Sequence, residues 1–189
     1  SSNGDVFHFE GGRLARAELK GGEALAFAGE RGAESLTRVE LRGGEVRHYA
    51  GGSGAERLTR IELPSGTYEY EGERGAEKAV RGALPDGQVH HYGVSGTEGL
   101  TRVALPSGEV RHYVGDYTAA PRLTRIELPD GDVRLYEGGN GAERLARIEH
   151  ADGSVHHYVG TRGAERLGQL EQPDGAVYHY DGERGGERL

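Results

Sequence analysis

The chain has 189 residues, of which 34 are glycine and none is cysteine, and its formal net charge is −8. The lack of cysteine excludes disulfides and thiol chemistry, and no apolar run reaches the roughly 20 residues that a membrane-spanning helix needs. The acidic balance argues against the phosphate backbone of a nucleic acid as a partner.

A segment of about 22 residues repeats along almost the whole chain. Aromatic residues mark the repeat, and after a shorter first interval they recur every 21 to 23 residues. These anchors are Phe9, Phe27, Tyr49, Tyr70, Tyr92, Tyr113, Tyr136, Tyr158 and Tyr180. Such a period is typical of a tandem array in which each copy is one supersecondary element. We predict a single array over residues 1–189, with about eight repeats, cut within a repeat at both ends.

Each copy is predicted to be a β-hairpin. The segment 57–63, RLTRIEL, is rich in β-formers, and it precedes a turn signal, here Pro-Ser-Gly and elsewhere Pro-Asp-Gly. Proline presets φ and glycine takes a positive φ, so this order of residues joins two strands. No segment has the 3.6-residue periodicity of a helix. The predicted fold class is therefore all-β: tandem ~22-residue hairpin repeats forming one elongated, twisted antiparallel sheet without helices.

The number of residues in the turn, even or odd, decides which residues of a hairpin lie opposite each other. A loop with an even number of residues would pair the Leu63 position with the Val46 position and the Ile61 position with the His48 position, and it would bring Thr59 to the same face. The other face would then have glutamate opposite arginine and arginine opposite tyrosine. An odd loop would instead place valine with glutamate and arginine. We expect the even register, because a slip of one residue scatters the apolar side chains over both faces.

Arginine recurs at one position of the repeat and glutamate at another. The arginines are Arg16, Arg38, Arg60, Arg81, Arg102, Arg125 and Arg147, and the loop glutamates are Glu34, Glu56, Glu77, Glu98, Glu143 and Glu165. A planar guanidinium can bridge a carboxylate of the neighbouring copy and stack on a tyrosine. We expect such a structural ladder, since lysine never takes this arginine position. The alternative is a solvated charged face worth little per pair.

The histidines are the set that most suggests metal binding. His48, His91, His112, His157 and His179 share one position of the repeat. Equivalent residues of successive copies lie roughly 10 Å apart, because each copy adds two strands at about 4.8 Å, and this is too far to share an ion. Adjacent residues such as His90 and His91 point to opposite faces. We therefore predict packing histidines and no metal site.

Catalysis is not expected either. Paired carboxylates recur equally in every copy, whereas acid–base catalysis needs one asymmetric group of residues. We predict no catalytic residue and no cofactor. One loop, residues 115–121 (GDYTAAP), departs from the repeated pattern and carries the candidate binding residues Asp116 and Tyr117. The alternative is neutral sequence change in a surface loop, where an insertion has little effect on stability.

The repeat resembles the MORN (membrane occupation and recognition nexus) repeat. The family pattern, roughly Y-x-G and then P-D-G-x-x-Y, is matched by Tyr136, Gly138, Asp152, Gly153 and Tyr158. The resemblance implies hairpins stacked into a long twisted sheet, and scaffolding, dimerisation or membrane-adjacent organisation rather than catalysis. Two features depart from the family. Its H-G-x-G segment and second aromatic are replaced by G-A-E-R-L-T-R, and a basic surface for lipid contact is absent, so charge does not support membrane association.

The repeat also resembles the YD repeat of Rhs-type shells. The matching residues are RLTRI at 122–126 and Pro129-Asp130-Gly131, followed by Tyr136. Eight copies are too few to build an enclosing shell, so this resemblance takes second place.

These patterns predict a non-enzymatic structural or scaffold module that mediates protein–protein association. A single-layer sheet leaves an apolar face and two edge strands open, which favours a protein partner or a homo-oligomer joined face to face or end to end. The alternatives are a YD-type shell segment accessory to another domain, and a surface that binds metal or lipid weakly.

Overall fold

The structure is a computed structural model that describes residues 4–93, 99–116 and 120–182. The chain divides into two compact units, Ser1–Asp86 and Gly87–Leu189. Every regular element of the described residues is a β-strand, and none of these residues forms a helix long and apolar enough to cross a bilayer. The predicted fold class, all-β repeated hairpins without helices, is confirmed.

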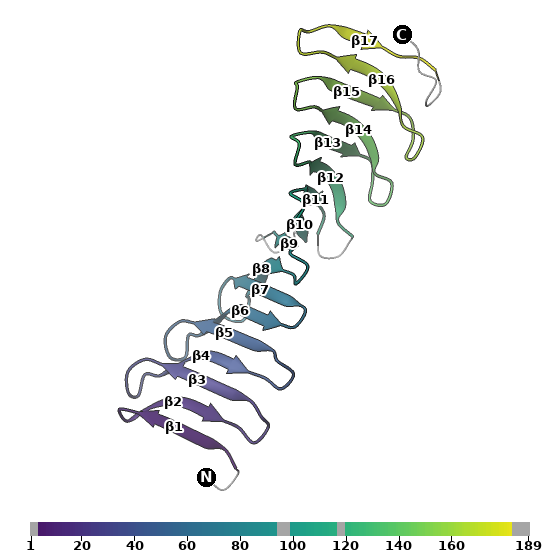
Figure 1. The fold of residues 1–189 in the computed structure, drawn as a ribbon. Coiled ribbons are helices and arrows are strands. Elements are labelled where there is room, and N and C mark those ends of the chain that lie inside the picture. The colour runs from purple at the N-terminus through teal and green to yellow at the C-terminus, as the bar shows by residue number, and fades with distance from the viewer. Residues whose placement is uncertain (1–3, 94–98, 117–119, 183–189) are drawn as a thin grey trace. The chain divides into compact units, whose positions relative to one another are not determined.

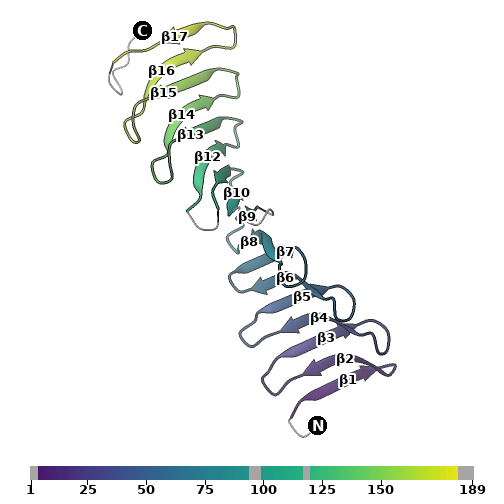
Figure 2. The ribbon, with the colours of Figure 1, turned by 180° about the vertical axis from the view of Figure 1, so that it is seen from behind.

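Each unit is an antiparallel meander in which consecutive strands pair, as Figure 1 shows. The strands of the first unit are β1 (Val6–Glu10), β2 (Arg13–Glu18), β3 (Ala24–Ala28), β4 (Ser35–Glu40), β5 (Val46–Ala50), β6 (Arg57–Leu63), β7 (Gly66–Glu71) and β8 (Lys78–Ala83). Those of the second unit are β9 (Val89–Tyr92), β10 (Leu100–Ala104), β11 (Val110–Val114), β12 (Arg122–Glu127), β13 (Val133–Glu137), β14 (Arg144–Glu149), β15 (Val155–Val159), β16 (Arg166–Glu171) and β17 (Val177–His179). Seen from behind in Figure 2, the described strands of each unit lie in one layer.

The Pro-Asp-Gly turn closes a loop of three residues. After β12, the Leu128 N–H donates to the Asp132 carbonyl at 2.8 Å, and the Gly131 N–H donates to the Leu128 carbonyl at 3.0 Å. The φ of Gly131 is 94°, so the loop is a turn followed by a left-handed glycine, which is the usual three-residue hairpin connection. Proline at the first loop position and glycine at the last suit these conformations.

The odd loop overturns the predicted register. In the β4–β5 hairpin, Glu40 lies opposite Val46, Val39 opposite Arg47, and Arg38 opposite His48. Val39, which takes the isoleucine position, therefore lies opposite arginine and not histidine, and Glu40 lies opposite valine and not arginine. The prediction was wrong because the conformation of the turn, and not the apolar pattern of the strands, sets the parity of the pairing.

A bulge between consecutive hairpins still collects the apolar side chains on one face. Between β5 and β6, Tyr49 pairs with Leu58 and its neighbour His48 pairs with Arg60, so Thr59 is the extra residue. The Thr59 Oγ1 hydroxyl donates to the His48 carbonyl at 3.2 Å across this bulge. Because the extra residue interrupts the alternation, Leu58 and the isoleucine three positions later reach the same face.

Each unit therefore has two chemically distinct faces. On the tyrosine face, the β5–β6 pair presents Arg47, Tyr49, Leu58 and Ile61. On the arginine face, the same pair presents Val46, His48, Arg60 and Glu62. The apolar residues that are buried most deeply, Ala17, Val103 and Ile126, occupy the isoleucine row of the tyrosine face and are 3%, 6% and 9% exposed. The core is thus one thin row, and no large side chain of the described residues is completely buried.

Candidate functional site

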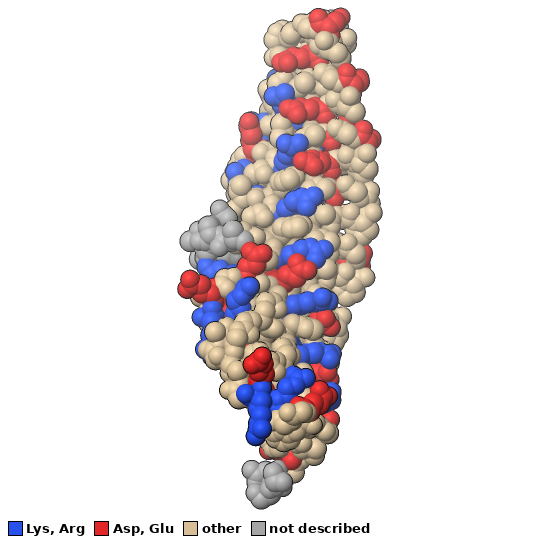
Figure 3. Space-filling view, turned by 90° about the vertical axis from the view of Figure 1, so that its left-hand side faces the viewer, with Lys and Arg blue, Asp and Glu red and all other residues tan. Residues whose placement is uncertain are grey.

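The arginine face carries a ladder of charged side chains. In the second unit, Arg125 Nη2 and His112 Nε2 both lie 3.1 Å from Glu127 Oε1. In the first unit, Arg60 and His48 contact Glu62 in the same way, at 3.0 and 3.1 Å. Further pairs join Arg38 to Glu40 at 2.7 Å and Arg147 to Glu149 at 2.8 Å. The upper part of Figure 3 shows these acidic and basic side chains interleaved along the second unit.

These contacts differ from the expected ones. Each of these arginines pairs with the glutamate two residues later in its own strand, not with a loop glutamate. Tyrosine lies on the opposite face of the sheet, so the arginine row cannot stack on it. Arg60 is 48% exposed and Glu62 is 38% exposed, and a solvent-exposed pair contributes at most about 1 kcal/mol. Arg102 instead approaches His91, with Nη1 3.3 Å from its Nε2.

The tyrosine anchors mark the contact between one hairpin and the next. Tyr49, Tyr70, Tyr92, Tyr113, Tyr136 and Tyr158 lie opposite Leu58, Ala79, Leu100, Leu123, Leu145 and Leu167, respectively. Tyr180 follows β17, and its N–H donates to the Gly168 carbonyl at 2.9 Å. Of the two loop candidates, Asp116 is exposed after β11, and Tyr117 lies outside the described residues.

The loop glutamates connect successive copies through the backbone. Glu77 Oε1 accepts the Leu58 N–H of the preceding copy at 3.0 Å, and Glu77 Oε2 accepts the Gly75 N–H of its own loop at 2.8 Å. The hairpin ladder of β6 and β7 ends at Arg60, so the glutamate satisfies a donor that the sheet leaves unpaired. The same bond joins Leu14 to Glu34, Leu36 to Glu56 and Leu145 to Glu165, at 3.2, 3.3 and 3.4 Å.

These hydrogen bonds hold the loop carboxylates in their charged form. The pKa of Glu77 is lowered, first by the hydrogen bond from its own backbone N–H and then by that from Leu58. The pKa values of Glu34, Glu56 and Glu143 are lowered for the same main reason. Of the arginine row, Arg81 makes the expected contact with a carboxylate of the preceding copy, with Nη1 3.0 Å from Glu69 Oε1. The loop glutamates connect copies in a way that the sequence did not predict, through backbone N–H groups.

One copy carries a polar cluster that departs from the repeated pattern. His150 stands where the turns after β4, β10 and β12 begin with leucine, and His156 stands where β5, β11 and β13 have arginine. The equivalent residues are Leu41, Leu105 and Leu128 for the first position and Arg47, Arg111 and Arg134 for the second. We call His150, His156, Asp132 and Asp152 the histidine cluster.

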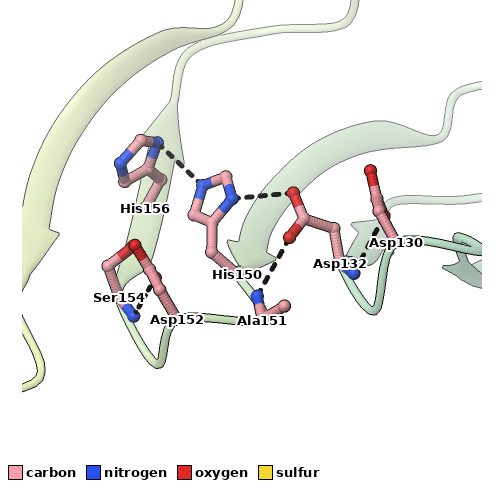
Figure 4. A network of polar contacts seen from close by, with 7 residues as sticks. All are labelled: Asp130, Asp132, His150, Ala151, Asp152, Ser154 and His156. Carbon is pink, nitrogen blue, oxygen red and sulfur yellow. Dashed lines mark hydrogen bonds and ion pairs between the residues drawn. The ribbon is translucent and has the colours of Figure 1, made fainter.

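The histidine cluster is a chain of short polar contacts, drawn in Figure 4. His150 Nδ1 lies 2.7 Å from Asp132 Oδ2, and His150 Nε2 lies 3.3 Å from His156 Nδ1. The Ala151 N–H donates to Asp132 Oδ1 at 3.0 Å and so holds the carboxylate in place. The two imidazole rings meet edge to face, with centroids 4.5 Å apart. The order of partners indicates that His150 donates from Nδ1 and accepts at Nε2 from His156.

Local electrostatics separate the charged groups of the cluster from the neutral ones. The hydrogen bond from the Ala151 backbone lowers the pKa of Asp132, and hydrogen bonds from the Ser154 backbone and hydroxyl lower the pKa of Asp152. Burial, with the neighbouring His150, lowers the pKa of His156. The cluster at neutral pH therefore combines two carboxylates with a neutral His156 ring. His150 and Asp132 are 26% and 24% exposed, so solutes can reach them.

Sequence reasoning missed this cluster. It treated adjacent histidines, such as His90 and His91, as residues that point to opposite faces, and it did not consider His150, which lies in the turn six residues before His156. The signal was present in the comparison of copies, because two positions change to histidine in the same copy. Within the described part of the chain, no group of three or more histidine, aspartate or glutamate side chains is arranged to hold a metal ion.

Comparisons with known proteins give no family for the chain. No described protein family and no curated protein matches it. Two crystal structures align with it: TcdB2-TccC3, at 13% identity over 96% of this chain with a TM-score of 0.21, and TcdB2-TccC3-TEV, at 12% identity over 89% with a TM-score of 0.19. This chain spans 11% of the length of either one. These values carry no argument about fold or function.

Proposed function

We propose that the chain is a non-enzymatic structural module whose tyrosine face binds protein, and that the first partner is a second copy of the chain. The supporting observation is the thinness of the core. The described strands of each unit form a single layer (Figures 1 and 2), and most side chains of the tyrosine face remain partly exposed. An apolar face of this kind gains free energy when another protein surface covers it.

A second copy suits this face because it has the same spacing. Tyrosine and leucine recur once per hairpin in both partners, so their side chains can interdigitate at every copy within a unit. An isologous dimer uses the same patch on both partners, which a repeating surface satisfies readily. A partner of different period would match at one copy and clash at the next.

The association is tested by light scattering on the purified chain over a range of about 10 to 500 µM. We expect a mass above that of the monomer, 20.3 kDa, that rises with concentration. A matched pair of variants distinguishes the faces: Tyr113→Glu places a charge on the tyrosine face, and Val114→Glu places one on the opposite face, one residue further along β11. Tyr113→Glu should abolish face-to-face association, and Val114→Glu should leave it intact. A strict monomer at the highest concentration contradicts the proposal.

The alternative of a YD-type shell segment, accessory to another domain, stays a prediction. The repeated hairpins are compatible with it. The parent sequence discriminates the two, because a shell segment would be part of a longer chain with an appended toxin or catalytic domain. A surface that binds metal or lipid weakly through the repeated histidines and arginines is the remaining alternative, and calorimetry with zinc and with anionic vesicles tests it.

A further inference from the structure

We propose that His150 and His156 form a two-histidine chelate for one divalent transition-metal ion of the kind that imidazole binds well, namely Zn²⁺, Ni²⁺ or Cu²⁺. The supporting geometry is the approach of His150 Nε2 and His156 Nδ1 to 3.3 Å. Two nitrogens that each bind one ion at roughly 2.1 Å lie about 3.4 Å apart in tetrahedral coordination. The two nitrogens are therefore already separated by the distance that a shared ion requires, and water completes the coordination.

Asp132 prepares His150 for this role. The His150 Nδ1–H donates to Asp132 Oδ2 at 2.7 Å, which leaves the Nε2 lone pair directed toward His156. A carboxylate on the far nitrogen is the common support of metal-binding histidines, because it sets the tautomer and raises the basicity of the ligand. The Ala151 N–H holds the other carboxylate oxygen at 3.0 Å. Asp132 is thus a positioning residue, and Asp152 adds negative charge nearby.

His156 needs one change in order to bind. His156 donates from Nδ1 to His150, so on metal binding its proton must move to Nε2 and the rings must rotate slightly until both lone pairs meet at one point.

The repeated histidine position does not provide such a pair. His112 and His157 each contact a glutamate on the arginine face, at 3.1 and 2.9 Å. The histidine cluster is different because its two rings belong to one hairpin and lie on either side of a single turn. The inference is independent of the proposed association, since both ligands come from one chain.

Calorimetric titration of the metal-free full chain with Cu²⁺ or Zn²⁺ at pH 7 tests the site. Two substitutions restore residues that other copies carry at the same positions, His150→Leu and His156→Arg, and so they preserve the repeat. We expect the wild-type chain to bind one ion per chain at a site that each variant weakens at least tenfold. His157→Leu is the matched control, because Leu135 occupies that position in the preceding copy, and it should leave the site unchanged.

Two further measurements distinguish binding at this one site from nonspecific binding to the other histidines of the chain. Asp132→Asn should keep the stoichiometry and weaken the affinity by about 10- to 100-fold. In the NMR spectrum of the wild-type chain, substoichiometric Cu²⁺ should broaden the ring signals of His150 and His156 before those of the other histidines. Broadening that is equal over all histidines, or an unchanged affinity in the His150→Leu/His156→Arg double variant, overturns the proposal.

Discussion

The loop glutamate is the residue on which the contact between copies depends most. Glu77 accepts backbone N–H groups from two copies with its two oxygens. A charge-assisted bond of this kind is stronger than a neutral one, and the donor at Leu58 has no ladder partner in β7. In the copies that carry this glutamate, a single carboxylate therefore links one hairpin to the next.

These carboxylates make stability depend on acid pH. The folded-state pKa values of Glu34, Glu56, Glu77 and Glu143 lie below the ordinary value of 4.5. The contribution of these carboxylates to the free energy of unfolding is therefore fully present above pH 4.5. It is lost as the pH falls through the folded-state values, because the unfolded chain then binds more protons. We expect the melting temperature, followed by circular dichroism, to fall steadily below about pH 4.5.

Glu77→Gln isolates one of these groups. Glutamine can accept one of the two N–H groups but carries no charge, so we expect the melting temperature at pH 7 to fall by a few degrees. Its fall on acidification should also be shallower than in the wild-type chain. Glu73→Gln, in the same loop and exposed, is the control and should match the wild type. If the melting temperatures of Glu77→Gln and the wild type fell equally on acidification, the loop glutamate would not be a source of the acid dependence.

The arginine row makes a smaller contribution. Arg60 contacts Glu62 and lies between His48 and Glu69 on the neighbouring strands. Arg60→Lys keeps the charge but loses the planar guanidinium, so we expect a loss in the free energy of unfolding of less than about 1 kcal/mol. Arg57→Lys should cost less still. Thermal melts of the two variants measure this difference. Equal losses of stability in Arg60→Lys and Arg57→Lys would mean that the arginine row has no special structural role.

At the scale of elements, two connections with different chemistry alternate along each unit. A short turn, such as Pro129-Asp130-Gly131, joins the strands of a hairpin, and a longer glycine-rich loop joins one hairpin to the next. Gly138 opens such a loop with a φ of 109°, and a Cβ there would overlap the Ala142 carbonyl oxygen. The first glycine after the tyrosine is thus required both for its backbone angle and for the close approach of the loop.

Adjacent glycines give a matched test of this loop. Gly138→Ala should destabilise the chain by about 2 kcal/mol or more, because a left-handed residue is strained and the new methyl group has no room. At Gly139 a Cβ would meet nothing within 4 Å, so Gly139→Ala should be near neutral. Urea unfolding of both variants makes the comparison. A similar loss for both would mean that the loop tolerates a side chain at either position.

At the scale of the whole molecule, stability is the sum of neighbouring contacts. Each described strand contacts the strands next to it in sequence and buries one thin row of side chains, so no central core links distant copies. Arrays of this kind open locally rather than all at once. The association we propose would add the burial that the single layer lacks.

Hydrogen exchange tests this local behaviour. In the Gly138→Ala variant, we expect faster amide exchange in β13, β14 and the strands next to them, and unchanged exchange in β2 to β5 of the other unit. The expected change follows from contacts that join neighbouring copies. Faster exchange at every strand would show instead that the chain unfolds as one cooperative body.

The all-β fold class could be predicted from the sequence, because glycine and proline recur at turn positions and β-formers fill the segments between them. The sequence also identified the tyrosines as the anchors of each copy. The register could be read only from the folded structure. It depends both on the three-residue turn within a hairpin and on the bulge at Thr59 between hairpins, and an argument from the residues of one strand pair does not include the bulge. The folded structure likewise decided which carboxylates join the copies, because Glu77 and Leu58 are 19 residues apart and meet only when two hairpins stack. The approach of His150 to His156 depends on the path of one turn, which the periodic pattern does not contain.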